Sequence, residues 1–263
     1  MMQVTKMHGA RNDFVVVDAR TERLLADAPA FARWVCDRRE GIGADGLILL
    51  EPSSVGNVRM RIINADGSEA EMCGNGIRCA ARWLDEAGEG DRRDFETEAG
   101  IVRTEILARE PEYLVRVALG KPNVGTITLD GSTEDFVEIG NPHVILLRGN
   151  VEGIDLERFA RQLQNDSRFP NGTNVHAAAK VGPNSLRVRH WERGAGLTPA
   201  CGTGAVACAA VAIRRQIAKS PVEVFVPGGR LEVDWNGIDA ASLTGPAVRV
   251  FDAEVRVGDR VRA

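Results

Sequence analysis

The sequence predicts an α+β fold with two pseudo-symmetric lobes that arose by internal duplication, each a β-barrel-like sheet around a central helix. The segments Met72–Gly76 and Ala200–Gly204 share a Cys-Gly-x-Gly kernel, and their cysteines are 128 positions apart. A run of small apolar residues follows each kernel and predicts that a helix begins there. Short segments rich in β-branched or alternating apolar residues surround both kernels, and these predict strands.

The second half of the chain repeats the first. Arg59–Asn64 aligns with Arg187–Glu192 at the offset that the cysteines set, and Asn12–Val17 aligns with Asn141–Leu146 at an offset larger by one. These matches occur in the same order in both halves. A repeat of this length is too long for a solenoid unit and indicates a duplicated domain.

We place the N-terminal lobe at 1–125 and the C-terminal lobe at 126–263, with the active site in the cleft between them. The boundary falls in the stretch 124–135, which contains two glycines and a serine. It remains open whether the C-terminal tail packs back onto the first lobe.

The expected elements follow from local patterns. In the first half, strands are expected at 14–18, 46–50, 58–64, 95–98, 101–107 and 113–119, and helices at 28–38 and 74–87. In the second half, strands are expected at 144–148, 175–180, 186–192, 222–226 and 231–235, and helices at 156–165 and 202–217. The helix at 202–217 is almost entirely apolar, so we expect it to run through the core of its lobe.

Composition excludes several classes of function. The net charge is −4 and no basic patch stands out, so we expect no nucleic-acid partner. The first residues lack a signal-peptide pattern, and no apolar run approaches the ~20 residues of a membrane span. We therefore expect a cytoplasmic protein that does not bind a membrane. The five cysteines are odd in number and lack zinc-like spacing, so we expect reduced thiols and no metal.

The paired thiols indicate a reaction at carbon. A helix N-terminus can lower the pKa of a thiol and keep a usable thiolate fraction near neutral pH. Two thiols across a cleft suit inversion of an α-carbon, since one removes a proton and the other returns one to the opposite face. Backbone N–H groups at the two helix starts would bind a carboxylate; they belong to Gly74, Asn75, Gly202 and Thr203. No dinucleotide or phosphate-loop motif is present, and we expect no cofactor.

Six segments together resemble a known family. They are MHGARNDFVVVD, CDRREGIGADGLILL, NADGSEAEMCGNGIRC, GNPHVILL, FPNGTNV and WERGAGLTPACGTGA. In this order, and over nearly the whole chain, they resemble the signatures of the diaminopimelate epimerase family. The resemblance implies the fold of that family and a cofactor-independent enzyme of lysine biosynthesis. Such an enzyme interconverts L,L- and meso-diaminopimelate with one catalytic cysteine from each lobe.

The resemblance also implies roles for individual residues. Cys73 and Cys201 would be the acid/base pair, and His143 and Glu192 would tune the thiols, with Glu192 also contacting the substrate. The residues that would hold the polar ends of the substrate are Asn12, Asn64, Asn141, Asn174 and Arg193. Arg11, Leu197 and Pro199 depart from the common family pattern, which bears on affinity or substrate breadth rather than on reaction type.

Several of these residues could instead have a structural role. His143 could cap a turn, and Glu192 and Arg193 could form a surface ion pair. Asn12, Asn141 and Asn174 could satisfy turns. His176 and His190 are expected to be structural. The cysteines expected to be small core residues are Cys36, Cys79 and Cys208.

Alternative functions remain open at this stage. A related racemase of the same fold could act on another amino acid such as proline or histidine. Proline-type relatives carry a histidine where this chain has Asn75, which counts against that version. A thiol-based redox or zinc-binding module, or a PhzF-like isomerase, are further alternatives. The oligomeric state is also open, with a homodimer as one possibility.

Overall fold

The computed structural model describes residues 1–21, 27–129, 131–164 and 166–256. By their contacts these residues form two units. Unit 1 comprises Met1–Val117 and the segment that begins at Pro246, and unit 2 comprises Ala118–Gly245. This division differs from the lobes placed at 1–125 and 126–263, because the segment after Val117 lies in unit 2 and the C-terminal segment lies in unit 1. The end of the predicted second lobe, residues 257–263, lies outside the described residues.

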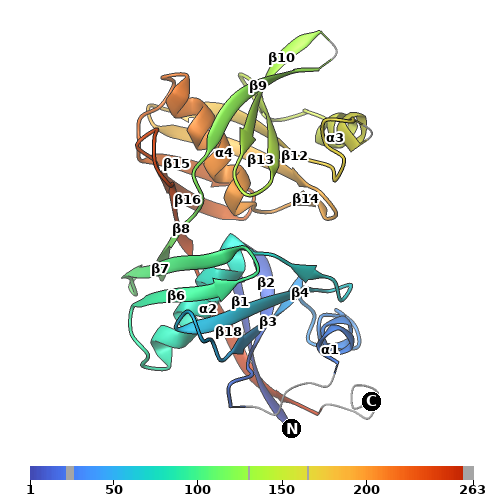
Figure 1. Cartoon of the computed structure of the whole chain (residues 1–263), viewed down its shortest axis with the longest axis vertical. Helices are drawn as coiled ribbons and strands as arrows, with labels where there is room; N and C mark the ends of the chain where they lie inside the picture. The colour runs from blue at the N-terminus through green and yellow to red at the C-terminus, as the bar shows by residue number, and fades with distance from the viewer. Residues whose placement is uncertain (22–26, 130, 165, 257–263) are drawn as a thin grey trace. The chain divides into compact units, whose positions relative to one another are not determined.

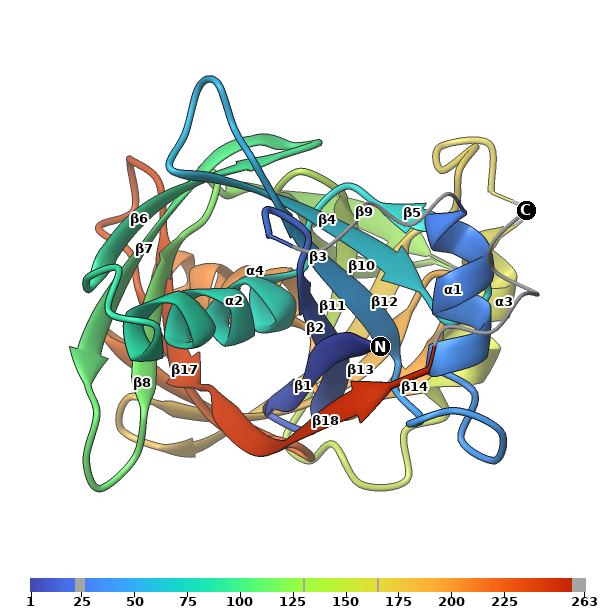
Figure 2. The same cartoon turned by 90° about the horizontal axis from the view of Figure 1, so that it is seen from below.

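Unit 1 is a curved mixed sheet around one helix (Figure 1). Its strands are β1 (Met2–Gly9), β2 (Asn12–Asp18), β3 (Gly46–Glu51), β4 (Val58–Asn64), β5 (Glu69–Ala70), β6 (Arg92–Thr97), β7 (Gly100–Ala108), β8 (Leu114–Ala118) and β18 (Val248–Val255). The pairs β2–β3 and β4–β6 are parallel, and the other pairs of this unit are antiparallel. Helix α2 (Gly74–Glu86) contacts β1, β2, β3, β4, β7 and β18, and Figure 2 shows the strands curving around it.

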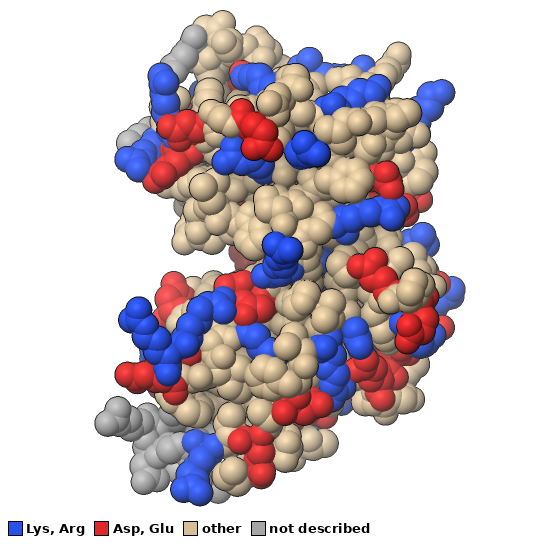
Figure 3. All heavy atoms as spheres, turned by 180° about the vertical axis from the view of Figure 1, so that it is seen from behind, with Lys and Arg blue, Asp and Glu red and all other residues tan. Residues whose placement is uncertain are grey.

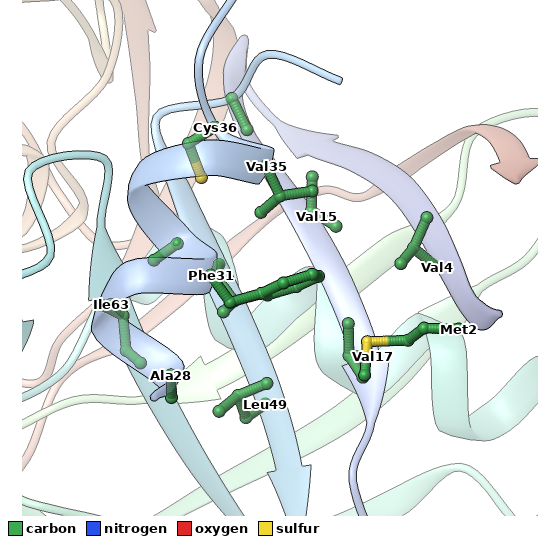
Figure 4. Close-up of a cluster of buried hydrophobic side chains, with 13 residues drawn as sticks. Met2, Val4, Val15, Val17, Ala28, Phe31, Val35, Cys36, Leu49 and Ile63 are labelled. Carbon is green, nitrogen blue, oxygen red and sulfur yellow. The ribbon is translucent and has the colours of Figure 1, made fainter. Parts of the chain in front are cut away.

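Helix α1 (Ala28–Val35) crosses between the parallel strands β2 and β3. Asp27 caps this helix through its carboxylate, which accepts a hydrogen bond from the Ala30 N–H at 2.8 Å. Its apolar face packs on the outer side of the sheet, where Phe31 lies among side chains of β1, β2 and β3 (Figure 4). Cys36 belongs to the same buried cluster, as expected of a small core residue.

Unit 2 repeats the order of elements found in unit 1. Its strands are β9 (Asn123–Leu129), β10 (Ser132–Glu138), β11 (Pro142–Leu147), β12 (Asn174–Gly182), β13 (Ser185–Glu192), β14 (Gly196–Thr198), β15 (Val222–Val226), β16 (Gly229–Asp234) and β17 (Ser242–Pro246). Here β11–β12 and β13–β15 are the parallel pairs. Helices α3 (Leu156–Gln164) and α4 (Gly202–Arg214) take the places of α1 and α2. The predicted helix 156–165 is thus α3, and Asn165 lies outside the described residues.

The two repeats exchange their final strands. In unit 2, β9 pairs with β10, the first strand of the second repeat. In unit 1, the corresponding partner of β1 is β18, which comes from the end of the second repeat; the register runs from Met2↔Val255 to His8↔Val248. This exchange is why the C-terminal segment belongs to unit 1.

The surface carries charges of both signs. Figure 3 shows Lys and Arg interspersed with Asp and Glu on the face it presents. Among the described residues, charged side chains form ion pairs such as Arg249 with Glu86 at 2.8 Å. A search of the described helices finds none with the length and apolar character needed to cross a membrane.

Candidate active site

Each Cys-Gly-x-Gly kernel places its cysteine at the N-cap of the central helix of its unit. Cys73 has an extended backbone, with φ −136° and ψ 116°, and Cys201 is nearly the same, with φ −123° and ψ 113°. The carbonyl of each cysteine accepts the first helical hydrogen bond, from Ile77 and Ala205 respectively, both at 2.9 Å. Both sulfurs lie beside the positive end of a helix dipole, and the Gly204 N–H in the first turn of α4 forms a hydrogen bond with the Cys201 thiol.

In unit 1 the Cys73 thiol meets the side chain of Asn12. The Cys73 Sγ donates to Asn12 Oδ1 at 3.5 Å, and Asn75 Nδ2 donates to the same oxygen at 3.2 Å. Asn12 Nδ2 in turn donates to Asp45 Oδ2 at 2.8 Å. Since a carboxylate only accepts hydrogen bonds, Asp45 sets which end of the Asn12 amide faces the thiol.

A buried arginine forms hydrogen bonds at the other end of this pair of hydrogen-bonded asparagine side chains. Arg78 is 0% exposed, and its guanidinium donates to Asn75 Oδ1 at 2.9 Å, to the Gly74 carbonyl at 3.0 Å and to the Pro246 carbonyl at 3.1 Å. Burial lowers its pKa. The two amides are therefore aligned between the charges of Asp45 and Arg78.

Asp45 is itself held by neighbouring charges. Arg38 donates to Asp45 Oδ1 at 2.9 Å and to both carboxylate oxygens of Asp13. Lys6 lies 2.6 Å from Asp13. Burial alone would raise the pKa of Asp13, but the hydrogen bonds from Arg38 and Lys6 hold it well below its usual value. These ion pairs and hydrogen bonds hold the Asp45 carboxylate in place, and that carboxylate orients the amide to which it bonds.

Asn64 is the last residue of β4, immediately before a turn. Its side chain donates to Ser68 Oγ at 3.0 Å, and its backbone N–H donates to the Ser68 carbonyl at 2.8 Å. The side chain is exposed. In this structure the Asn64 side chain therefore stabilises a turn.

In unit 2 the Cys201 thiol meets Glu192 and Thr203. The Cys201 Sγ lies 3.7 Å from Thr203 Oγ1 and forms a hydrogen bond with the Glu192 carboxylate. Burial and the negative charge of Glu192 raise the pKa of Cys201 well above its usual value, although the Gly204 N–H and the Thr203 hydroxyl act in the opposite direction. For Cys201 the expectation of a lowered pKa is therefore wrong, because desolvation and the carboxylate outweigh the helix terminus.

Glu192 is half-buried beside this thiol. Burial raises its pKa, and hydrogen bonds from Cys201 and from the Thr198 hydroxyl act against that increase. A thiol and a carboxylate that both resist ionisation can share one proton between them. The pair can therefore pass that proton from sulfur to oxygen.

Asn174 connects two predicted site residues. Its Oδ1 accepts from the Arg193 backbone N–H at 3.0 Å, and its Nδ2 donates to the Pro142 carbonyl at 3.3 Å. The Arg193 guanidinium donates to the Asn171 carbonyl at 2.7 Å. Asn141 Oδ1 is buried and has no hydrogen-bond partner among the described residues, which leaves an acceptor for a ligand.

His143 contacts His176, which in turn contacts His190; both of these were expected to be structural. His143 Nδ1 lies 2.8 Å from His176 Nε2, and His176 Nδ1 lies 2.9 Å from His190 Nδ1. Burial lowers the pKa of His143 and of His190 to about 3 each. In the described residues no group of three or more metal-binding side chains is arranged to hold a metal ion.

Comparison with known proteins decides the family. The family model described as diaminopimelate epimerase matches residues 4–125 and 136–250. The chain belongs to the diaminopimelate epimerase family. A family member from Moorella thermoacetica is 42% identical over 95% of this chain and 98% of that relative. The diaminopimelate epimerase of Azotobacter vinelandii is 40% identical over 98% of this chain and 100% of that relative.

Solved structures share the fold at much lower identity. A phenazine biosynthesis protein of the PhzF family from Bacillus anthracis has a TM-score of 0.77 and 19% identity, covering 97% of this chain and 99% of that one. A probable proline racemase from Agrobacterium radiobacter has a TM-score of 0.72 and 16% identity, covering 98% and 94%. Together with the family match, these confirm the α+β fold predicted from the sequence.

In this member of the diaminopimelate epimerase family, different predicted site residues lie beside each of the two cysteines. Asn12, Gly74 and Asn75 lie at the Cys73 helix start, and Glu192, Gly202 and Thr203 lie at the Cys201 helix start. The residues that sequence reasoning missed are Asp45, Arg78 and Thr198, which fix the orientation of site side chains through charge and hydrogen bonds.

Proposed function

We propose that this chain is a cofactor-independent epimerase that interconverts L,L- and meso-diaminopimelate in lysine biosynthesis, in the cytoplasm. The observation that carries the proposal is the pair of N-cap cysteines at equivalent positions of the two repeats in a member of this family. Inversion at one α-carbon needs a base on one face and an acid on the other.

The proposed reaction is a two-base exchange of protons. One cysteine thiolate removes the α-proton, so the C–H bond breaks and a new S–H bond forms. The other cysteine thiol donates its proton to the opposite face of the carbanion and becomes the thiolate. In the reverse direction the two cysteines exchange these roles.

The groups that surround each thiol indicate which thiol starts the reaction as the acid and which as the base. The Cys73 thiol donates to Asn12, which suits the acid. The Cys201 thiol bonds to the Glu192 carboxylate, which can accept its proton and so generate the base. The substrate carboxylate at the reacting centre would accept hydrogen bonds from backbone N–H groups at the two helix starts, those of Gly74, Asn75, Gly202 and Thr203.

The remaining predicted residues would hold the parts of the substrate away from the reacting carbon. The guanidinium of Arg193 suits the distal carboxylate, and the unpartnered oxygen of Asn141 suits an ammonium group. Asn64 and Asn174 are proposed to complete this binding. For Asn64 this requires that its amide leave Ser68.

The test is epimerisation in deuterated water without pyridoxal phosphate. With L,L-diaminopimelate, we expect meso product that carries deuterium at the inverted α-carbon. Cys73→Ala and Cys201→Ala should each abolish epimerisation, whereas Cys208→Ala, which removes a buried thiol further along α4, should retain it. Absence of both product and α-deuterium with the unaltered protein would refute the proposal.

A related racemase acting on another amino acid is the second candidate. The exposed Leu197, at a position that departs from the family pattern, is the observation that favours it. A panel of amino acids separates the two candidates, since an enzyme for a diacid should lose more from Arg193→Ala than an enzyme for a monocarboxylate. A zinc or redox module instead predicts bound metal or a disulfide in the active form.

We also propose that the chain forms a homodimer through β18. This strand pairs with β1 along one side, and its Val250 and Phe251 are 52% and 44% exposed. Apolar side chains at a strand edge suit a self-complementary two-fold contact. Sedimentation should show a dimer that Phe251→Glu converts to a monomer; a monomeric unaltered chain would contradict the proposal.

A further inference from the structure

Three buried histidines of unit 2 form a continuous hydrogen-bonded row. His143 on β11, His176 on β12 and His190 on β13 are each no more than 1% exposed. The row runs from His143 Nδ1 to His176 Nε2 at 2.8 Å and from His176 Nδ1 to His190 Nδ1 at 2.9 Å. Both ring nitrogens of His176 are thus engaged by other rings.

The number of protons in this row is limited. A neutral imidazole carries one N–H, and each of the two hydrogen bonds needs one donor and one acceptor. If both outer rings donated, His176 would have no proton; if both accepted, it would be an imidazolium buried without a counter-charge. Two neutral arrangements remain, and in both of them His143 and His190 have opposite tautomers.

The two arrangements differ in what they leave unpaired. His143 Nε2 and His190 Nε2 are both buried without a partner among the described residues. One of these nitrogens carries a proton and the other does not. An unpaired buried N–H is rarer than an unpaired acceptor, so the N–H belongs at the end of the row that a ligand can reach.

The His143 end is next to the residues proposed to hold substrate. His143 is aligned with Asn174 in the parallel register of β11 and β12, and the Asn174 side chain accepts from the Arg193 backbone at 3.0 Å. The charge of Arg193 also contributes to lowering the pKa of His143, after burial and His190. For His190, burial is the cause of the lowered pKa.

We propose that His190 and His176 are positioning residues that hold His143 as the neutral Nε2–H tautomer, a hydrogen-bond donor on the strand next to Asn174. In this arrangement His190 Nδ1–H donates to His176 Nδ1, and His176 Nε2–H donates to His143 Nδ1. His143 Nε2–H is then directed away from the row. The row limits His143 to two neutral tautomers, and the choice of the Nε2–H form rests on the proposed function because it uses the residues proposed to hold substrate.

The row also contacts the start of the helix that Cys201 heads. A β-carbon at Gly204 would lie 2.5 Å from His176 Cε1 and 2.8 Å from His176 Nε2. The absence of a side chain at Gly204 therefore lets the central ring pack against the first turn of α4.

Nitrogen NMR of protein labelled in its histidine rings tests the proposal directly. The chain has four histidines, so single substitutions, including His8→Gln, assign every signal. At neutral pH we expect protonation at Nε2 for His143 and His176 and at Nδ1 for His190. A His143 ring protonated at Nδ1, or at both nitrogens, would overturn the proposal.

Two variants at the central position separate positioning from packing. In His176→Gln the amide can still donate to His143 Nδ1, so we expect the Nε2–H signal of His143 to remain. In His176→Leu that donor is gone, and we expect a mixture of His143 tautomers with kcat reduced about fivefold. An unchanged His143 spectrum in His176→Leu would overturn the proposal. If the tautomers are as expected but the unaltered protein does not catalyse epimerisation, the proposed function is refuted while the proposed tautomer of His143 is retained.

Discussion

The imidazole of His176 occupies the space that a β-carbon on Gly204 would need, with its Cε1 2.5 Å from that position. Gly204 is the third residue of α4, which Cys201 heads. This relationship links the histidine row of unit 2 to the geometry of one proposed catalytic thiol.

Substituting this glycine should therefore be harmful even though alanine is the better helix former. We expect Gly204→Ala to lower the free energy of unfolding by about 1–3 kcal/mol, the usual effect of overpacking a core. Gly149→Ala is the matched control, because a β-carbon there would meet nothing within 4 Å. Urea denaturation of both variants measures the difference, and equal stabilities would contradict the packing argument.

Asp45→Asn should disturb the Cys73 side of the site. An asparagine at this position can donate as well as accept, so the Asn12 amide would no longer be held with its oxygen toward the thiol. We expect kcat to fall about tenfold, which is the size of a lost hydrogen bond to a charged group. Asp239→Asn is the control, since Asp239 also accepts from an asparagine amide, that of Asn236, at 2.8 Å. Steady-state kinetics of both variants decide the point, and unchanged kcat in Asp45→Asn would mean that Asn12 needs no such anchor.

Arg78→Met should destabilise unit 1. It would leave Asn75 Oδ1 and the carbonyls of Gly74 and Pro246 without the guanidinium that now bonds to all three. Leaving a buried acceptor without its hydrogen-bond donor typically costs about 1–3 kcal/mol, and three acceptors lose a donor here. Arg92→Gln, which breaks an exposed pair with Glu105, should cost about 1 kcal/mol or less. Denaturant titration compares them, and similar losses would show that Arg78 is not the anchor described above.

Glu192→Gln should change the pH dependence of Cys201. A raised pKa keeps this thiol protonated at neutral pH, and the thiolate forms only as pH rises through that pKa. Burial remains the main cause in the variant, but the carboxylate charge that also raises the pKa is removed. The pKa should therefore fall, and alkylation of Cys201 should begin at lower pH than in the unaltered protein.

The same variant should turn over substrate more slowly, because no carboxylate remains to accept the thiol proton.

The alkylation of Cys201 can be followed by peptide mass spectrometry in a Cys73→Ala background. The peptides of Cys36 and Cys208, whose pKa values are raised by burial, serve as internal references. An alkylation profile that moves to higher pH would contradict the role given to Glu192.

The features that depend on local pattern could be predicted from the sequence. The cysteine kernels, the starts of α2 and α4 and the central apolar strands all follow from short segments. The strands β1, β9, β10 and β18 were not predicted, because polar residues interrupt their apolar pattern and their pairing is set by tertiary contact. The predicted helix 202–217 is too long, since α4 ends at Arg214 and Gln216 adopts a positive φ of 58°.

The histidine row was missed for a different reason. His176 and His190 meet because β12 and β13 pair antiparallel around the turn at Gly182, which places them opposite each other. His143 joins them through the parallel register of β11 and β12. The Pro-Asn pair at Pro183 and Asn184 marks that turn and could have indicated the first contact, but a parallel register leaves no comparable local signal. Likewise, the pKa of Cys201 depends on burial, which the residues around the kernel do not reveal.

The exchanged strand β18 has a consequence for biosynthesis. During translation β1 emerges early, while the strand that covers its edge is encoded about 250 residues later, as the pair Met2↔Val255 shows. A nascent chain therefore carries the β1 edge without its native partner until β18 has left the ribosome. Unit 2, whose covering strand β9 directly precedes β10, is free of that delay and can complete its sheet first.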